Sequence, residues 1–215
     1  MSAADPARSQ GAAAAGTTHL LYLHGFRSSP RSFKARRLEQ WLARHQPMLR
    51  WWCPQLPPSP REAMALVESG IAGWPASHMA VVGSSLGGYY AAWLAERHGC
   101  PAVLINPAVQ PARDLARHIG EQTSWHDPAE RFFFRPGFVD ELRALEAGPF
   151  QPDGSRARAR LAIVAKGDEL LDWREMAARC SGAELHLVDG SDHALSDFDR
   201  HLPRLLQFLG LHDRG

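Results

Sequence analysis

One short segment of the sequence has the residue types and spacing of an exposed nucleophile. Residues 83–87 read G-S-S-L-G, a G-x-S-x-G pattern, between an apolar run that ends at Val82 and a segment of helical character. A strand, a sharp turn and a helix form the context in which this pattern raises its central serine above a sheet. The flanking glycines let the two backbones approach closely. The sequence therefore predicts that the Ser85 hydroxyl is placed to attack a carbonyl carbon.

A serine hydroxyl is a weak nucleophile and needs a base to take its proton. His193 lies in the glycine-containing loop after the last apolar run, and Asp168 follows the preceding run directly after Gly167. Both loops begin where a parallel sheet delivers side chains to its carboxyl edge. We expect His193 to be the base and Asp168 to orient and stabilise its ring. Asp172 is the competing acid, although its position also suits the cap of the next helix.

An attacked carbonyl develops an oxyanion that needs hydrogen-bond donors. The expected donors are the backbone N–H of Leu86, directly after the nucleophile, and that of Phe26 in the H-G-F segment. We expect His24, which opens that segment, to brace the loop rather than act as a base. The residues considered as substrate-lining are His24, Tyr89, Phe132, Phe133 and Phe134. For the three phenylalanines, packing of their segment onto the sheet is the alternative.

Elements that would position these groups follow from the alternation of short apolar runs with segments of helical spacing. Six runs predict strands: His19–Leu23, Leu49–Cys53, His78–Val82, Ala102–Ile105, Leu161–Ala165 and Glu184–Val188. Helices are expected over 32–45, 61–73, 86–98, 172–179 and 197–209. Right-handed crossovers give the strand order 2-1-3-4-5-6. The switch point between strands one and three then coincides with Ser85 and the His24 loop.

The chain divides into a tail and one domain. Residues 1–18 are rich in Ala, Ser and Gly and predict a disordered tail, and 19–215 predict a single α/β domain. Between strands four and five, the pattern loosens over about 110–158. Helical pieces near Pro111–Ile119 and Gly137–Ala147 and a group of aromatic residues indicate a small cap inserted there.

Composition excludes several classes of function. The 215 residues are 45% apolar and 22% charged with a formal net charge of +1, and no basic stripe indicates nucleic-acid binding. No apolar run approaches the roughly 20 residues that span a bilayer. Three separated cysteines and no ligand-spaced cluster argue against disulfides, zinc or another metal. We expect a cytoplasmic protein without a cofactor, and the oligomeric state stays open.

Residues 21–34, L-Y-L-H-G-F-R-S-S-P-R-S-F-K, resemble the H-G-F-x-S-S-P-x-S opening of the YqiA-type family of bacterial esterases. Four further segments match that family in order, at 83–88, 105–109, 167–172 and 192–193. The resemblance spans about Leu20 to Leu209. It implies an α/β-hydrolase fold, with helices on both faces of a mainly parallel six-stranded sheet. It also implies a cytoplasmic serine esterase in which Ser85, Asp168 and His193 fill the triad.

Three functions remain open on these residues. The leading one is hydrolysis of a small-molecule ester or thioester, with short or medium acyl chains preferred because the cap is small. The same site could instead transfer the acyl group to an alcohol or amine, which depends on how well water is excluded. The third is a non-catalytic binding protein with this fold. Such proteins usually lack one member of the triad, whereas all three positions hold suitable residues here.

Overall fold

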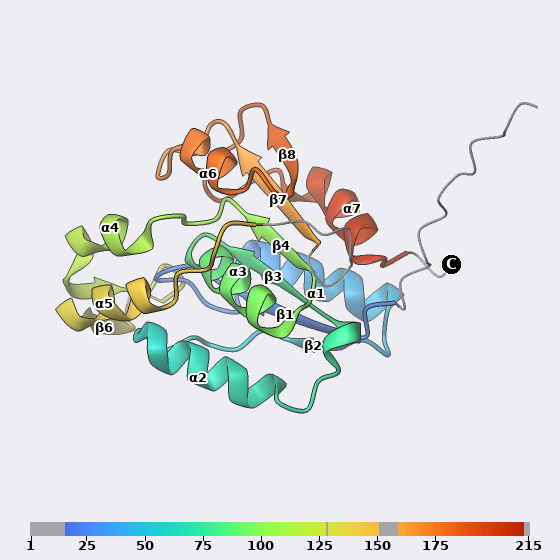
Figure 1. Cartoon of the computed structure of the whole chain (residues 1–215), viewed down its shortest axis with the longest axis horizontal. Coiled ribbons are helices and arrows are strands. Elements are labelled where there is room, and N and C mark those ends of the chain that lie inside the picture. Colours follow the sequence, from blue (N-terminus) through green and yellow to red (C-terminus); the bar gives the residue numbers. More distant parts are fainter. Residues whose placement is uncertain (1–15, 128, 151–158, 213–215) are drawn as a thin grey trace, which may run out of the picture.

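In the computed structural model, a sheet of six parallel strands lies at the centre of the molecule, with helices packed beside it (Figure 1). The structure describes residues 16–127, 129–150 and 159–212. The strands of the sheet are β1 (His19–Leu23), β2 (Arg50–Trp52), β3 (Met79–Ser84), β4 (Ala102–Ile105), β7 (Arg160–Ala165) and β8 (Glu184–Val188). Their order is β2-β1-β3-β4-β7-β8, and every neighbouring pair is parallel. This is the predicted order 2-1-3-4-5-6. The last two strands are labelled β7 and β8 because β5 and β6, which lie outside this sheet, precede them in the chain.

Helices cover both faces of the sheet and create two separate apolar cores. Alternate residues of β1 point to opposite faces, as a strand requires. Leu20 and Tyr22 pack with α1 (Phe33–His45) and α7 (Phe198–Leu209). Leu21 and Leu23 face the other core, whose helices include α2 (Pro60–Ile71), α3 (Leu86–His98) and α6 (Trp173–Arg179). Burial on both faces explains why the central strands read as continuous apolar runs.

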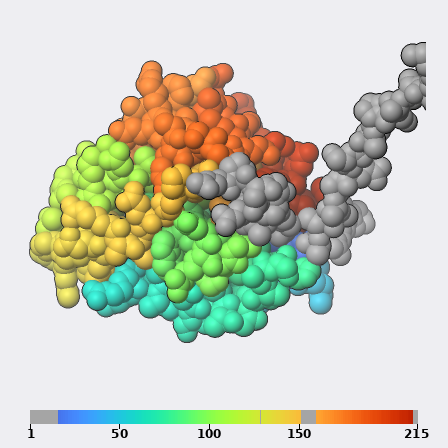
Figure 2. Space-filling model, in the orientation of Figure 1, coloured from blue at the N-terminus to red at the C-terminus, as the bar shows by residue number. Residues whose placement is uncertain are grey.

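The segment between β4 and β7 forms a cap at one end of the molecule. It comprises α4 (Pro111–Leu115), the short η2 (Ala116–His118), β5 (Gly120–Thr123), β6 (Arg131–Phe134) and α5 (Pro136–Ala144). β5 and β6 pair as an antiparallel hairpin. In Figure 2 this segment, coloured light green to gold, covers the surface between the cyan and orange parts of the chain. The hairpin was not predicted, because G-E-Q-T in β5 has no alternation of apolar residues.

Where strands of the sheet and the helices on its faces differ from the predictions, their ends differ by one or two residues, and in the cap α5 ends three residues before the predicted Ala147. β3 follows a short η1 (Ala76–His78) and continues to Ser84, two residues beyond the predicted end, so the strand runs directly into the nucleophile turn. Residues 1–15 of the predicted tail and 151–158 of the predicted cap lie outside the described residues. Thr17 is buried, and its hydroxyl donates a 2.8 Å hydrogen bond to the Leu209 carbonyl. Within the described residues, none of the helices has the length and hydropathy that crossing a bilayer needs.

Candidate active site

Ser85 stands at the turn between β3 and α3 in an unusual backbone conformation. Its φ is 57° and its ψ is −123°, a region that few residues other than glycine adopt. A Cβ on Gly83 would come within 2.0 Å of the Gly87 carbonyl oxygen, and one on Gly87 within 2.0 Å of the Leu23 carbonyl oxygen. Neither position has room for a side chain. The two glycines of the sequence pattern therefore permit the close approach of α3 to the strands that holds Ser85 at this turn.

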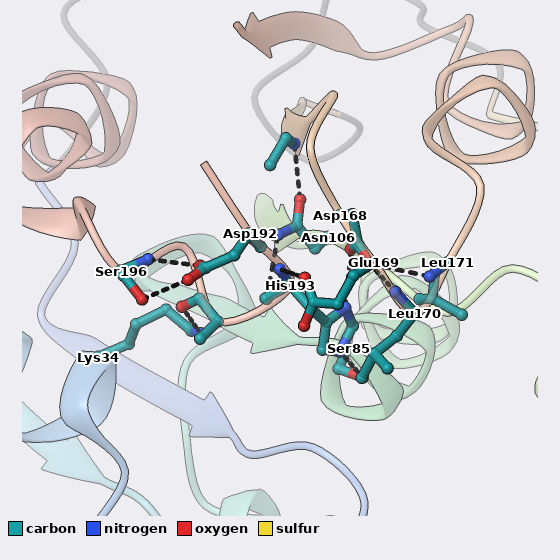
Figure 3. Close-up of polar contacts among 12 residues, drawn as sticks. Lys34, Ser85, Asn106, Asp168, Glu169, Leu170, Leu171, Asp192, His193 and Ser196 are labelled. Atoms are coloured by element: carbon teal, nitrogen blue, oxygen red, sulfur yellow. Dashed lines mark hydrogen bonds and ion pairs between the residues drawn. The ribbon is translucent and has the colours of Figure 1, made fainter. Parts of the chain in front are cut away.

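The structure brings together the three residues expected to act on a substrate. His193 Nε2 lies 2.9 Å from Ser85 Oγ, and His193 Nδ1 lies 2.7 Å from Asp168 Oδ2 (Figure 3). These residues follow three different strands, β3, β8 and β7, and meet at the carboxyl edge of the sheet. With the Nδ1 proton donated to the carboxylate, Nε2 is left to accept the proton of the serine hydroxyl. The arrangement can remove a proton from Ser85 as its oxygen attacks an electrophile.

Asp168 and Asp172 have different environments. The Asp168 side chain is fully buried, and its Oδ1 accepts hydrogen bonds from the backbone N–H groups of Leu170 (2.9 Å) and Leu171 (2.8 Å). These bonds fix the carboxylate and leave Oδ2 for His193. Asp172 instead caps α6 by accepting a 2.9 Å hydrogen bond from the Arg174 N–H. Of the two acids considered from the sequence, only Asp168 hydrogen-bonds to the imidazole.

Asn106 is a positioning residue that the sequence analysis did not identify. It is fully buried directly after β4, and its Nδ2 donates to the backbone carbonyls of Asp192 (3.0 Å) and His193 (3.1 Å). Its Oδ1 accepts a 2.8 Å hydrogen bond from the Ala165 N–H at the end of β7. One amide therefore joins β4, β7 and the loop that carries His193. The signal in the sequence was the family match at 105–109, which gave Asn106 no role of its own.

Glu169 also contacts the histidine loop. Its Oε2 accepts a 2.9 Å hydrogen bond from the backbone N–H of His193. The side chain lines the cavity above Ser85 as well. The sequence placed Glu169 in the family match at 167–172 but gave it no role, because its partner is a backbone group that becomes adjacent only when β7 and β8 pair.

A cavity of about 840 Å³ opens beside Ser85 and includes both residues expected to donate to an oxyanion, Phe26 and Leu86. Leu86 begins α3. The loop of Phe26 lies against the nucleophile, since a Cβ on Gly25 would be 3.1 Å from Ser85 Cβ. The cap closes one side of the cavity, where Arg27 Nε donates a 2.6 Å hydrogen bond to the Thr123 carbonyl. The cavity thus lies between the β1 loop, the cap and the histidine loop.

Of the residues considered as substrate-lining, only His24 lines this cavity. The other four residues lie outside its lining. The Tyr89 hydroxyl donates a 2.7 Å hydrogen bond to the Leu142 carbonyl of α5. The rings of Phe132 and Phe134 pack against Phe26, with centroids 5.8 Å and 5.3 Å away, and support that residue from behind the cavity. Phe133 is exposed.

His24 braces the loop that carries Phe26. Its Nδ1 lies 3.0 Å from the Gly25 carbonyl oxygen, and its Nε2 accepts a 3.1 Å hydrogen bond from the Leu56 N–H. Burial lowers the pKa of His24 from 6.5 to about 4, so the ring is neutral near pH 7. Both ring nitrogens are engaged by backbone groups, which leaves neither for a substrate. Among the described residues, no group of three or more His, Cys, Asp or Glu side chains is arranged to hold a metal ion.

The fold is that of the α/β hydrolases. A putative hydrolase from Agrobacterium vitis S4 superposes with a TM-score of 0.67 at 17% identity, over 90% of each chain. The mouse alpha/beta hydrolase domain-containing protein 10 gives 0.65 at 14% identity, over 90% of this chain and 91% of that one. The monoacylglycerol lipase of Paleococcus ferrophilus gives 0.63 at 15% identity, over 91% and 96%. These likenesses define the α/β-hydrolase fold predicted from the sequence.

The model of the uncharacterised protein family UPF0227 matches residues 19–210. The chain therefore belongs to this family, which is the YqiA-like family, and the resemblance seen in the sequence is confirmed.

Proposed function

We propose that this protein is a serine hydrolase that cleaves carboxylic esters or thioesters through an acyl-enzyme. The observation that carries the proposal is the unbroken chain of contacts from Ser85 Oγ through His193 to Asp168, at 2.9 Å and 2.7 Å. A buried carboxylate stabilises the imidazolium that forms when the histidine takes the serine proton. The esterases and lipases among the structural neighbours support the same chemistry.

The reaction proceeds in two halves. Ser85 Oγ attacks the carbonyl carbon while its proton passes to His193 Nε2, and the carbonyl oxygen becomes an oxyanion. The bond to the leaving group then breaks, and His193 returns the proton to the departing alcohol or thiol. Water enters, gives a proton to His193 and attacks the acyl carbon. The bond to Oγ breaks, the acid departs, and Ser85 regains its proton.

The oxyanion is stabilised by the backbone N–H groups of Leu86 and Phe26. Leu86 N–H lies in the first turn of α3, where helix N–H groups have no partner within the helix and the dipole favours negative charge. Phe26 is held by His24 on one side and by the phenylalanines of the cap on the other. Such preorganised donors are worth about 10²–10³-fold each in kcat in comparable sites.

Short and medium acyl chains are the preferred substrates in this proposal. The cap contributes only one hairpin, two α-helices and the short η2, so it is a small cover over the cavity of about 840 Å³. We expect kcat/KM for 4-nitrophenyl esters to be highest for chains of about two to six carbons. A value that rises steadily toward sixteen carbons would refute this preference. The three separated cysteines fit the reducing cytoplasm, in which we propose the protein acts.

The decisive experiment compares Ser85→Ala with Ser181→Ala on 4-nitrophenyl butyrate. Ser181 is an exposed serine in the turn before β8, on the amino side of that strand, and serves as the matched control. We expect Ser85→Ala to lose at least about 10⁴-fold in kcat, as removal of such a nucleophile does. Ser181→Ala should retain the activity of the unmodified chain. Equal activity of the two variants would rule out Ser85 as the nucleophile.

Covalent labelling separates catalysis from mere binding. A fluorophosphonate should form an adduct at Ser85 in the unmodified chain and none in Ser85→Ala, as read by mass spectrometry of the peptide. Absence of an adduct in the unmodified chain would favour a non-catalytic binding protein. Product analysis with added alcohol then distinguishes hydrolysis from acyl transfer, because a transferase yields the new ester in preference to the free acid.

A further inference from the structure

The lining of the cavity beside Ser85 includes residues at the start of α1. We call this part of the cavity the lysine chamber and define it by four of the residues that line the cavity: Tyr22 of β1, Ser84 of β3, and Ser32 and Lys34 at the start of α1. Tyr22, Lys34 and Ser84 are almost completely buried. By contrast, Trp125 and Arg117, which line the cavity from the cap, are exposed. The four residues of the lysine chamber are thus less exposed than these two residues of the cap.

Lys34 brings a buried positive charge to the chamber. It is only 8% exposed, and its Nζ donates a hydrogen bond to the carbonyl of Ala194, next to His193 (Figure 3). The carboxylate of nearby Asp192 accepts hydrogen bonds from the N–H (2.8 Å) and the Oγ (2.6 Å) of Ser196. An ammonium has three donor protons. In the described part of the chain, no carboxylate lies in ion-pair contact with the Lys34 ammonium.

Three side chains with hydroxyl groups line the cavity together with Lys34. The hydroxyls of Tyr22, Ser32 and Ser84 lie close together. Yet Tyr22 Oη and Ser32 Oγ are buried without a well-formed hydrogen bond among the described residues. A buried polar atom without a partner is costly, so each is poised to bond to something that enters the chamber. Ser32 is also the N-cap of α1, but its side chain does not cap the helix.

The start of α1 adds further positive potential. Its first turn contains no acidic residue. The N–H groups at a helix start carry a partial positive charge that favours anions. The ammonium, the hydroxyls and the helix end come from separate elements and favour the same kind of ligand, a compact anion that accepts several hydrogen bonds.

We propose that the lysine chamber binds a carboxylate at the far end of the acyl group, so that the substrates are half-esters or half-thioesters of short dicarboxylic acids. This inference rests on the proposed hydrolase function. The acyl part is assigned to the chamber because it stays bonded to Ser85 while the leaving group must depart. A wall of buried residues suits the part that stays. The carboxylate accepts hydrogen bonds from Lys34 Nζ and from the Tyr22 and Ser32 hydroxyls.

The test compares monoethyl glutarate with ethyl pentanoate, which have acyl chains of equal carbon count and differ in the terminal carboxylate. We expect the unmodified enzyme to favour the half-ester by at least about tenfold in kcat/KM, the scale of a charge-assisted hydrogen bond. Lys34→Met should bring the ratio of the two kcat/KM values close to one, whatever activity both esters lose through the histidine loop. Tyr22→Phe, which removes only a hydroxyl, should reduce the preference in part. Arg36→Met removes an exposed cation from the same helix and should leave it unchanged.

Two results would overturn the proposal. One is an unmodified enzyme that hydrolyses both esters equally well, which needs no variant and so does not depend on how Lys34→Met folds. The other is an equal loss on both esters in Lys34→Met, which would make Lys34 a support of the histidine loop only. Hydrolysis of both esters that disappears in Ser85→Ala would leave the proposed function standing. A lack of Ser85-dependent hydrolysis of any ester would instead refute that function itself.

Discussion

Asn106 Nδ2 donates a 3.1 Å hydrogen bond to the backbone carbonyl of His193, and so ties the loop of the proposed base to the end of β4. Asn106 is the only asparagine in the chain, and its φ of 40° lies in the region that asparagine tolerates better than most residues. Its amide nitrogen serves the His193 loop and its amide oxygen serves Ala165. The side chain therefore donates hydrogen bonds through its nitrogen and accepts one through its oxygen.

The first prediction concerns Asn106→Asp. A carboxylate oxygen would face two carbonyl oxygens in place of the donating nitrogen, so the loop should shift and His193 should lose its alignment with Ser85. We expect kcat to fall about 10–100-fold with KM changed less than about threefold, as for a misplaced catalytic group. Steady-state kinetics and thermal unfolding check this together. A variant that unfolds more easily but keeps full kcat would show that Asn106 supports only the fold.

The second prediction separates the two candidate acids. In Asp168→Asn, an amide nitrogen facing His193 Nδ1 would favour the wrong tautomer, and kcat should fall about 10³–10⁴-fold. Asp172→Asn is the matched control, because asparagine also caps helices well, and its kcat should stay within about twofold. Both are measured on the same ester. The reverse outcome, a large loss for Asp172→Asn alone, would transfer the role of acid to that residue.

The third prediction concerns the space beside the nucleophile. A methyl group at Gly25 would lie 3.1 Å from Ser85 Cβ and 3.3 Å from the Ser84 carbonyl oxygen. The Phe26 loop would have to move by a few tenths of an ångström, which disturbs a proposed oxyanion donor. We expect Gly25→Ala to lower kcat/KM about tenfold. Gly73→Ala, where an added Cβ meets no atom within 4 Å, should change nothing. Similar kinetics for the two variants would contradict this account of the loop.

The fourth prediction is a pH dependence of stability that arises from His24. Burial holds the pKa of His24 at about 4 in the folded protein, below the 6.5 of an exposed histidine. Between these values, the unfolded chain binds a proton that the folded chain does not, so stability falls as the pH is lowered from 6.5 to 4. The loss reaches about 3 kcal/mol at and below pH 4.

Chemical denaturation at a series of pH values checks this prediction. His24→Gln, which offers an acceptor for the Leu56 N–H but does not titrate, should lose less stability than the unmodified chain over that interval. The comparison of the two curves removes the contribution of carboxylates that titrate in both proteins. Parallel curves would show that His24 takes up its proton equally in the folded and unfolded states.

Several parts of the fold could be predicted because their cause is local. The strands of the sheet were recognisable as apolar runs, and β1, α3, β4 and β8 have the predicted bounds. The cap hairpin was missed because the residues of β5 are mostly polar, and their sequence pattern does not indicate pairing with β6. Tyr89 was considered as a substrate contact because of its place in α3. Its hydroxyl points instead to Leu142, across a contact between α3 and α5 that the sequence does not reveal.

The sequence by itself determined which side chains could react and which strands carry them. The G-x-S-x-G turn, the loops after two later strands and the right-handed crossovers are consequences of local sterics and of the order of elements. Tertiary structure decided the partners that hold these groups in place. The Asn106 amide, the Glu169 carboxylate and the Lys34 ammonium all bond to backbone atoms of the segment 192–194. A backbone atom has the same chemistry in every residue, so no pattern in a single sequence reveals which one a distant side chain will meet.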